Sequence, residues 1–94
     1  MVTRTSYTVH GPDATETAFE LPAGLAGLFT EDGEDDTDVI ADFVIQMFTQ
    51  QAHAIMHHNA GETPEAFPEM NAEMETLFEE RFGISIEEAM GHAH

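Results

Sequence analysis

The sequence predicts an α+β fold in which an N-terminal β-hairpin packs on a long central helix, followed by one medium and one short C-terminal helix. Residues 3–21 alternate between two kinds of side chain around a Gly-Pro turn, whereas the later segments repeat apolar residues at helical spacing. The chain has 94 residues, 41% of them hydrophobic, which suits one small domain with a core. With no internal repeat and no boundary between domains in view, we expect a single domain over residues 1–94.

The hairpin is expected over about 3–21, with its turn at Gly11-Pro12-Asp13-Ala14. Strict alternation of side chains, together with β-branched and aromatic residues, favours strands. The more apolar side of the hairpin comprises Thr3, Thr5, Tyr7, Val9, Thr15, Thr17, Phe19 and Leu21. Pro22 suits the first position of a short helical turn. One side of that turn would carry Leu25, Leu28 and Phe29.

An acidic connection over about 30–37 leads to the central helix, expected over about 38–58 with Asp36, Thr37 or Asp38 as its N-cap. At about 100° per residue, this helix has one broad apolar face. The face comprises Val39, Ile40, Phe43, Val44, Met47, Phe48 and Ile55, widened by Ile45, Ala52 and Met56. The remaining polar stripe comprises Asp42, Gln46, Thr49, Gln50, His53 and His57. Such a wide apolar arc predicts a buried, central helix.

Two further helices are expected, over about 64–82 and 85–91. Pro64 suits the first turn of the former, and Pro68 allows a short turn before a helix that starts near residue 68. Gly83 is a natural C-terminal stop, and Ser85 with Glu88 forms a capping-box pattern for the last helix. The apolar stripe of the medium helix comprises Phe67, Met70, Met74, Leu77, Phe78 and Phe82.

The predicted elements leave apolar surface that a second copy would cover. A lone two-stranded ribbon is marginally stable, and the 38–58 helix has more apolar surface than one neighbour buries. A homodimer joined across a two-fold axis, through the helices or the ribbon edges, would satisfy both. The alternative is a monomer whose long helix is buried between the hairpin and the second helix.

The methionine side chains could either fill the core or form an adaptable binding surface. The five internal ones are Met47, Met56, Met70, Met74 and Met90. Their positions on the predicted buried arcs favour the core.

The net charge of the chain indicates that the protein works at high salt concentration. Nineteen acidic residues, with Arg4 and Arg81 as the two basic side chains and no lysine, give a formal net charge of -17. Such a chain repels itself in dilute buffer, whereas in molar salt the Debye length falls to about 3 Å and screens the repulsion. This pattern is typical of proteins from organisms that accumulate salt in their cytoplasm.

Two segments carry a resemblance: His53-Ala54-Ile55-Met56-His57-His58 and Phe78-Glu79-Glu80-Arg81-Phe82-Gly83. With the strand pair and the acidity, they make the chain similar to small acidic haloarchaeal proteins of unknown function. The resemblance covers most of the chain and implies a halophilic cytoplasmic protein, with no activity attached.

Histidines are the candidate metal ligands. His53 and His57 are one helical turn apart, so their imidazole rings can reach a common ion, and zinc, nickel and copper commonly bind imidazole nitrogen. The further candidates are His58, His92 and His94. The alternative is that His53 and His57 are exposed or interact with the last carbonyls of their helix. The pattern His-Glu-x-x-His of zinc proteases is absent.

Several classes of function find no support in the sequence. The absence of cysteine excludes disulfides and thiolate sites, and no phosphate-binding loop or nucleophile motif is present. Two basic residues are too few for a nucleic-acid surface, although a dimer with a ribbon and helices is similar in outline to small transcription regulators. No apolar run is long enough to span a membrane, and no signal peptide is evident. We therefore expect a non-enzymatic structural or interaction module without a cofactor, with an unidentified protein partner as an alternative to self-association and divalent-metal binding as the second hypothesis.

Overall fold

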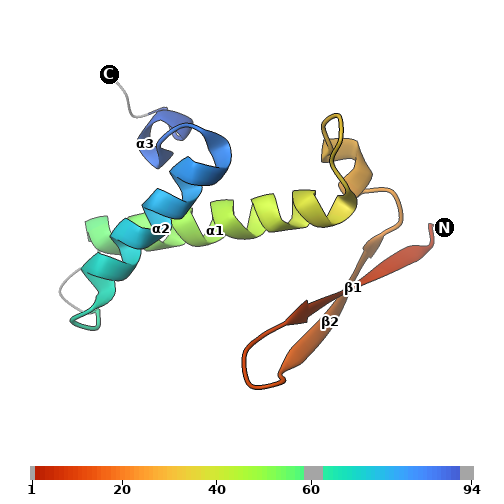
Figure 1. Ribbon diagram of the computed structural model, residues 1–94, viewed down its shortest axis with the longest axis horizontal. Helices are drawn as coiled ribbons and strands as arrows, with labels where there is room; N and C mark the ends of the chain where they lie inside the picture. The colour runs from red at the N-terminus through yellow and green to blue at the C-terminus, as the bar shows by residue number, and fades with distance from the viewer. Residues whose placement is uncertain (1, 59–62, 92–94) are drawn as a thin grey trace. The chain divides into compact units, whose positions relative to one another are not determined.

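The computed structural model describes residues 2–58 and 63–91. Its elements are β1 (Arg4–His10), β2 (Glu16–Pro22), the 3-10 helix η1 (Ala26–Phe29), α1 (Asp36–His58), α2 (Phe67–Phe82) and α3 (Ile86–Ala89) (Figure 1). The predicted α+β class and the order of elements are confirmed. Internal contacts divide the chain into two compact units, Met1–Ile40 and Ala41–His94, and each is described by itself.

The first unit contains the antiparallel hairpin in the register that the alternation predicts. Tyr7 pairs with Phe19 and Thr5 with Leu21, and the rings of Tyr7 and Phe19 stack with centroids 5.7 Å apart. These four side chains are partly buried, whereas the opposite side of both strands is exposed. A hairpin with one sheltered side therefore forms, as side-chain alternation with period two requires.

The hairpin turn has Asp13 and Ala14 as its two central residues. The Thr15 amide donates to the Pro12 carbonyl at 3.3 Å, and the two residues between them, Asp13 and Ala14, both have φ of 62°. Positive φ at both central positions is typical of the type I′ turn, whose twist matches that of antiparallel strands. Ala14 adopts this conformation although its side chain disfavours it.

Pro22 combines two roles, one of them not predicted. It is the last residue of β2 and pairs with Arg4, and its carbonyl accepts from the Leu25 amide at 3.1 Å, so a turn follows it. Proline is tolerated at a strand edge because the amide hydrogen it lacks is not needed there. The helical turn η1 begins later, at Ala26, which is buried; Leu28 and Phe29 in the same turn are exposed.

Helix α1 begins at Asp36, two residues earlier than predicted. The Asp38 carboxylate accepts from the Asp35 amide at 2.9 Å, the reciprocal contact of a capping box. The hydroxyl of Tyr7 donates to Asp36 Oδ2 at 3.0 Å, which joins the hairpin to the first turn of α1 within this unit. Partial burial raises the pKa of the Tyr7 hydroxyl, and its hydrogen bond to Asp36 and the negative charge of that carboxylate add to the increase.

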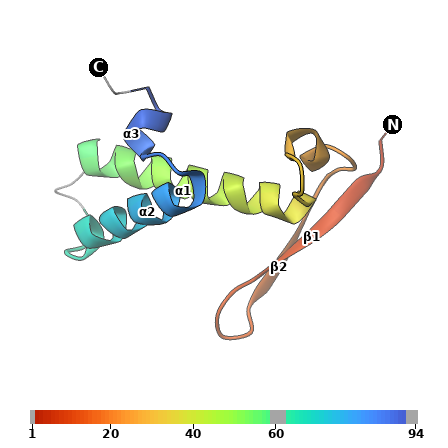
Figure 2. The ribbon, with the colours of Figure 1, turned by 45° about the horizontal axis from the view of Figure 1, so that its top comes forward.

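The second unit contains the remainder of α1, with α2 and α3. Helix α2 runs antiparallel to α1, since Arg81 Nε donates to Asp42 Oδ1 at 2.5 Å near one end and His53 lies against Glu75 further along (Figure 2). Phe78 of α2 and Ile86 of α3 are buried and form the apolar core of this unit. No described helix has the length and apolarity that a membrane span requires.

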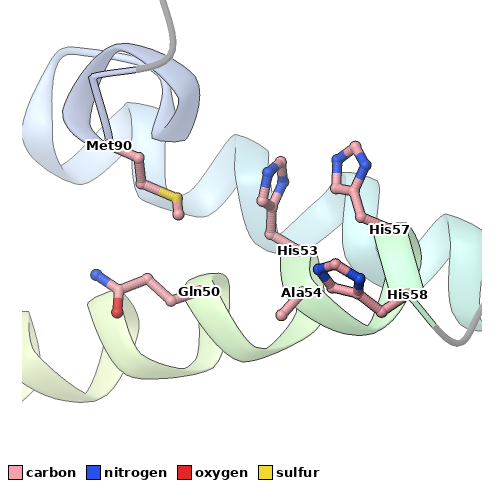
Figure 3. A pocket seen from close by; sticks show the side chains of 6 residues that line it. All are labelled: Gln50, His53, Ala54, His57, His58 and Met90. Carbon is pink, nitrogen blue, oxygen red and sulfur yellow. The ribbon is translucent and has the colours of Figure 1, made fainter.

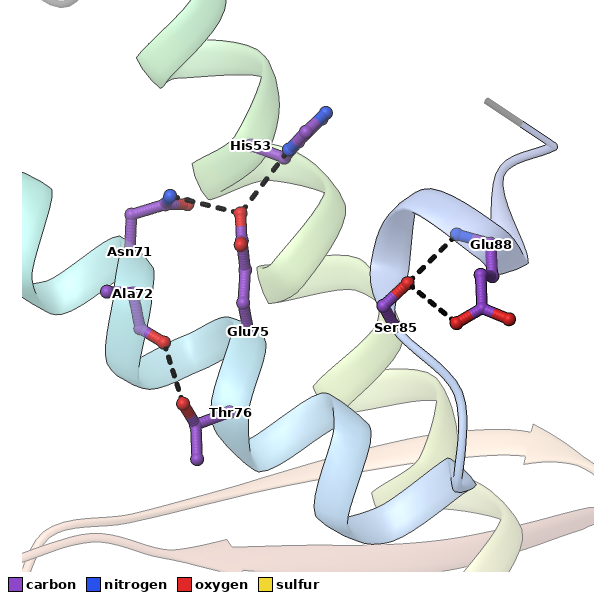
Figure 4. Close-up of polar contacts among 7 residues, drawn as sticks. All are labelled: His53, Asn71, Ala72, Glu75, Thr76, Ser85 and Glu88. Atoms are coloured by element: carbon purple, nitrogen blue, oxygen red, sulfur yellow. Dashed lines mark hydrogen bonds and ion pairs between the residues drawn. The ribbon is translucent and has the colours of Figure 1, made fainter. Parts of the chain in front are cut away.

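The C-terminal end of α2 and the start of α3 lie where the sequence predicts them. Gly83 follows Phe82 with φ of 78° and its amide donates to the Glu79 carbonyl, the left-handed C-terminal conformation that glycine adopts without strain. Ser85 caps α3 by accepting from the Glu88 amide at 3.1 Å (Figure 4). Helix α2 begins at Phe67 with Pro68 in its first turn, so residues 64–66 of the predicted helix form a turn instead.

The packed side of α1 only partly matches the predicted one, since Val39 is buried and Ile45, Ala52, Ile55 and Met56 of the predicted arc are partly buried. Thr49, from the predicted polar stripe, is fully buried, and its hydroxyl donates to the Ile45 carbonyl at 2.6 Å. Asp42 and His53, also from that stripe, meet partners on α2. Conversely, the middle of the predicted buried arc is about half exposed: Phe43 is 46% exposed, Val44 44%, Met47 54% and Phe48 63%.

Candidate functional site

The predicted histidine site takes the form of an open hollow beside α1. The hollow has a volume of about 260 Å³ and its lining residues are Gln50, His53, Ala54, His57, His58 and Met90 (Figure 3). Five of them project from successive turns at the C-terminal end of α1, and Met90 follows α3. Three of the predicted ligands, His53, His57 and His58, thus come together at one place.

Within this hollow the two histidines of the helical repeat differ in environment. Their ring centroids are 4.3 Å apart in an edge-to-face arrangement, as side chains four residues apart on a helix allow. The side chain of His53 is 12% exposed, and its Nδ1 lies 3.4 Å from Glu75 Oε2. His57 is exposed. His53 is therefore engaged with α2, while His57 faces solvent.

Glu75 completes a small polar cluster between the two helices. The same Oε2 atom accepts from Asn71 Nδ2 at 3.1 Å (Figure 4). The other side-chain atom of that amide, Asn71 Oδ1, is buried without a hydrogen-bond partner among the described residues. This cluster joins α1 to α2 and orients the His53 ring toward the hollow.

Metal coordination requires more ligands than this arrangement supplies. Over residues 2–58 and 63–91, no group of three or more histidine, aspartate or glutamate side chains is placed to hold a metal ion. The predicted ligands His92 and His94 lie outside the described residues. The described part of the hollow therefore offers a pair of imidazoles with a thioether nearby, not a closed metal shell.

A second candidate site is the partly exposed apolar surface on α1, which we call the exposed α1 face and define as Phe43, Val44, Met47 and Phe48. At about 100° per residue these four side chains fall within an arc of about 140° on the helix. The arc continues toward the C-terminus through Gln51 and Ala54, which are both exposed. Scattered exposed apolar residues are ordinary, but a contiguous group of large ones indicates an interaction surface.

The exposed α1 face is also free of negative charge. The last acidic residue of α1 is Asp42, and residues 43–58 contain none, although the chain has nineteen acids. The exposed residues beside this face are neutral or histidine: Gln50, Gln51, Ala54, His57 and His58. The outer side of α2 differs, since it carries the exposed carboxylates of Glu69, Glu73, Glu79 and Glu80.

The sequence grouped these residues on one apolar face of α1 and left open whether a second copy or the rest of the chain covers it. The long gap in acidic residues after Asp42 is the sequence feature that sets this face apart. The methionines divide in the same way. Met47, Met70 and Met90 are exposed, whereas Met56 and Met74 are partly buried, so the predicted core role is wrong for the first three.

Comparison with known proteins places the chain in a family. A family model described as a family of unknown function, DUF7545, matches residues 1–94, and the chain belongs to that family. No curated protein and no solved structure matches it.

Proposed function

We propose that this member of the DUF7545 family is a non-enzymatic protein-interaction module that associates with a second copy of itself through the exposed α1 face. The observation that carries the proposal is the contiguous exposure of Phe43, Val44, Met47 and Phe48 on a helix whose opposite side is packed. Removing such side chains from water contributes about 25 cal/mol for each Å² that is buried.

Charge favours a second copy over a different partner. A basic partner would be attracted to carboxylates, and residues 43–58 have none. Two copies of this chain, each with a net charge of -17, repel one another except where their contact surfaces are uncharged. A two-fold axis brings the same patch of each copy together, so an acid-free apolar patch suits self-association.

The proposed setting is the salt-rich cytoplasm of a halophilic organism. Nineteen acids against two basic residues support this, because high ionic strength is needed to screen the repulsion within and between chains. Under these conditions apolar contacts carry the association, since exposed ion pairs are weak in molar salt.

The test is the molar mass in solution. In molar potassium chloride, size-exclusion chromatography with light scattering should give twice the chain mass of 10.4 kDa. Met47→Glu places a charge in the exposed α1 face and should shift the protein to monomer, raising the dissociation constant at least tenfold. Leu28→Glu is the matched control because Leu28 is 78% exposed in η1; its dimer should persist. A monomeric wild type, or equal behaviour of both variants, would overturn the proposal.

Metal binding is the second candidate function, and the paired rings of His53 and His57 at 4.3 Å favour it. Two imidazoles on successive turns of one helix form a partial site for zinc or another divalent transition metal. Elemental analysis of untagged protein across the chromatographic peak tests it. About one metal per chain or dimer, lost in the double variant with His53→Gln and His57→Gln, would support this candidate; a metal-free peak would exclude it.

A further inference from the structure

The hollow beside α1 is lined by a thioether as well as by imidazoles. The rings of His53 and His57 lie there with their centroids 4.3 Å apart. Met90, in the turn that follows α3, points its thioether toward the part of α1 that carries Gln50 and His53 (Figure 3). These residues all belong to the unit Ala41–His94. Two imidazoles and one thioether thus border a single volume of about 260 Å³.

Glu75 orients one of these imidazoles for binding a metal ion. Glu75 Oε2 lies 3.4 Å from His53 Nδ1 and also accepts from Asn71 Nδ2 at 3.1 Å. Because a carboxylate accepts hydrogen bonds and does not donate them, it favours the tautomer with the proton on Nδ1 and the lone pair on Nε2. Carboxylates orient metal-binding histidines in the same way. His53 is thus arranged as a ligand through Nε2.

The chemistry of the lining groups indicates the ion that they suit. Zinc is bound by imidazole, thiolate and carboxylate, with four ligands in structural sites. A thioether instead selects monovalent copper. The described residues that line the hollow include no carboxylate, although the chain has nineteen acidic side chains. The lining therefore suits a soft ion better than an ion that prefers charged oxygen ligands.

We infer that His53, His57 and Met90 bind monovalent copper in this hollow. Linear and trigonal ligand sets satisfy this ion, so two imidazoles and one thioether suffice. Met90 supplies the reach, since its side chain has three rotatable bonds and the residue is 40% exposed. This inference rests on metal binding as the second candidate function, whose ion it specifies, and is independent of self-association.

Helical geometry separates His58 from this ligand set. At about 100° per residue, His57 lies about 40° from His53 around α1, whereas His58 lies about 140° from it. In Figure 3 the rings of His53 and His57 extend to the same side of α1, and the ring of His58 lies apart from them. His58 is therefore a matched control within the same hollow.

Titration with monovalent copper tests the inference. The protein, kept reduced with ascorbate under nitrogen, competes with bicinchoninate for copper in molar sodium sulfate, because chloride itself binds this ion. We expect about one copper per chain, bound at least tenfold more tightly than zinc. Met90→Leu keeps an apolar side chain of similar size. It should weaken copper binding at least tenfold and leave zinc binding within about twofold, because the thioether is the ligand that selects copper.

Further variants define the ligand set. His53→Gln and His57→Gln should each weaken copper binding at least tenfold, whereas His58→Gln should leave it within about twofold. Met70→Leu, at an exposed methionine of α2, should likewise have no effect. The double variant with His92→Gln and His94→Gln, outside the described residues, should retain the ion. Circular dichroism in the same salt verifies that the helices of each variant are intact.

Two spectroscopic measurements report on the roles of Met90 and Glu75. X-ray absorption of the copper-loaded protein should show a sulfur neighbour that is lost in Met90→Leu. Glu75→Gln replaces a pure acceptor with an amide that also donates, so it no longer fixes the His53 tautomer. Nitrogen NMR of the imidazole rings should show that change, together with copper binding weakened about tenfold.

The outcomes separate this inference from metal binding in general. Zinc bound more tightly than copper, or copper bound equally well by Met90→Leu without a sulfur neighbour, would overturn the copper site and leave the second candidate function intact. Loss of copper in His58→Gln, or in the double variant at positions 92 and 94, would overturn the ligand set. A chain that binds neither ion would overturn both. The molar mass in solution tests self-association separately.

Discussion

Tyr7 is the residue whose surroundings are most open to direct measurement. It is the single tyrosine of a chain without tryptophan, so near-ultraviolet absorbance of phenolate reports on it alone. Partial burial, the hydrogen bond to Asp36 and the charge of that carboxylate raise its pKa above the ordinary value. The stability that the neutral phenol contributes is present below pH of about 10 and is lost as the pH rises through the raised pKa.

We therefore expect the phenolate absorbance of folded protein to appear at higher pH than that of protein unfolded in urea. Asp36→Asn removes the carboxylate charge and should lower the pKa only partly, because burial is the largest cause and persists. A spectrophotometric titration in molar potassium chloride measures both midpoints. Equal midpoints for folded and unfolded protein would contradict the hydrogen bond between the hairpin and α1.

At the scale of elements, the hairpin turn offers a stabilising change. Ala14 has φ of 62°, a conformation that costs alanine about 1 kcal/mol relative to glycine. Ala14→Gly should therefore stabilise the hairpin by about 1 kcal/mol. Tyrosine fluorescence during urea unfolding reports this, since Tyr7 lies in β1. Ala18→Gly, inside β2, is the control and should destabilise the hairpin by about 0.5–1 kcal/mol. A loss of stability in Ala14→Gly would contradict the positive φ of residue 14.

The elements also show which parts of the fold a single sequence predicts. The hairpin register follows from alternation because a slip of one residue would exchange its two sides, and Gly83 and Ser85 mark helix ends through local conformation. These features depend on neighbours in the chain. The packed side of α1 does not: whether Thr49 or Met47 is buried depends on which surface α2 meets.

Pairwise matches between α1 and α2 explain why part of the polar stripe of α1 lies on its packed side, beside Ile45, Ala52 and Met56. Arg81 meets Asp42 and Glu75 meets His53 across the two helices, so polar groups are satisfied where they are partly buried. Thr49 is small enough for close helix approach and bonds its own backbone. Periodicity alone does not contain these matches, and an apolar face that remains exposed has the same sequence pattern as one that is buried within the chain.

For the whole molecule, salt should control folding as well as association. A net charge of -17 on 94 residues produces repulsion over a Debye length of about 10 Å at 0.1 M salt and about 3 Å at 1 M. Lowering potassium chloride from molar to below about 0.1 M should thus unfold the helices reversibly, with loss of the far-ultraviolet circular dichroism signal. Sucrose at matched osmolality provides the control, because it stabilises proteins by exclusion without screening charge.

Protein concentration connects that transition to the proposed interface. If the exposed α1 face is covered in the native dimer, the salt midpoint should fall as the protein concentration rises, since association stabilises the folded state by mass action. Met47→Glu should remove this concentration dependence and raise the midpoint, while Leu28→Glu should keep the dependence. A full helical signal in dilute buffer would contradict the halophilic setting. A concentration-independent midpoint in the wild type would instead separate folding from self-association, so salt would act on the single chain alone.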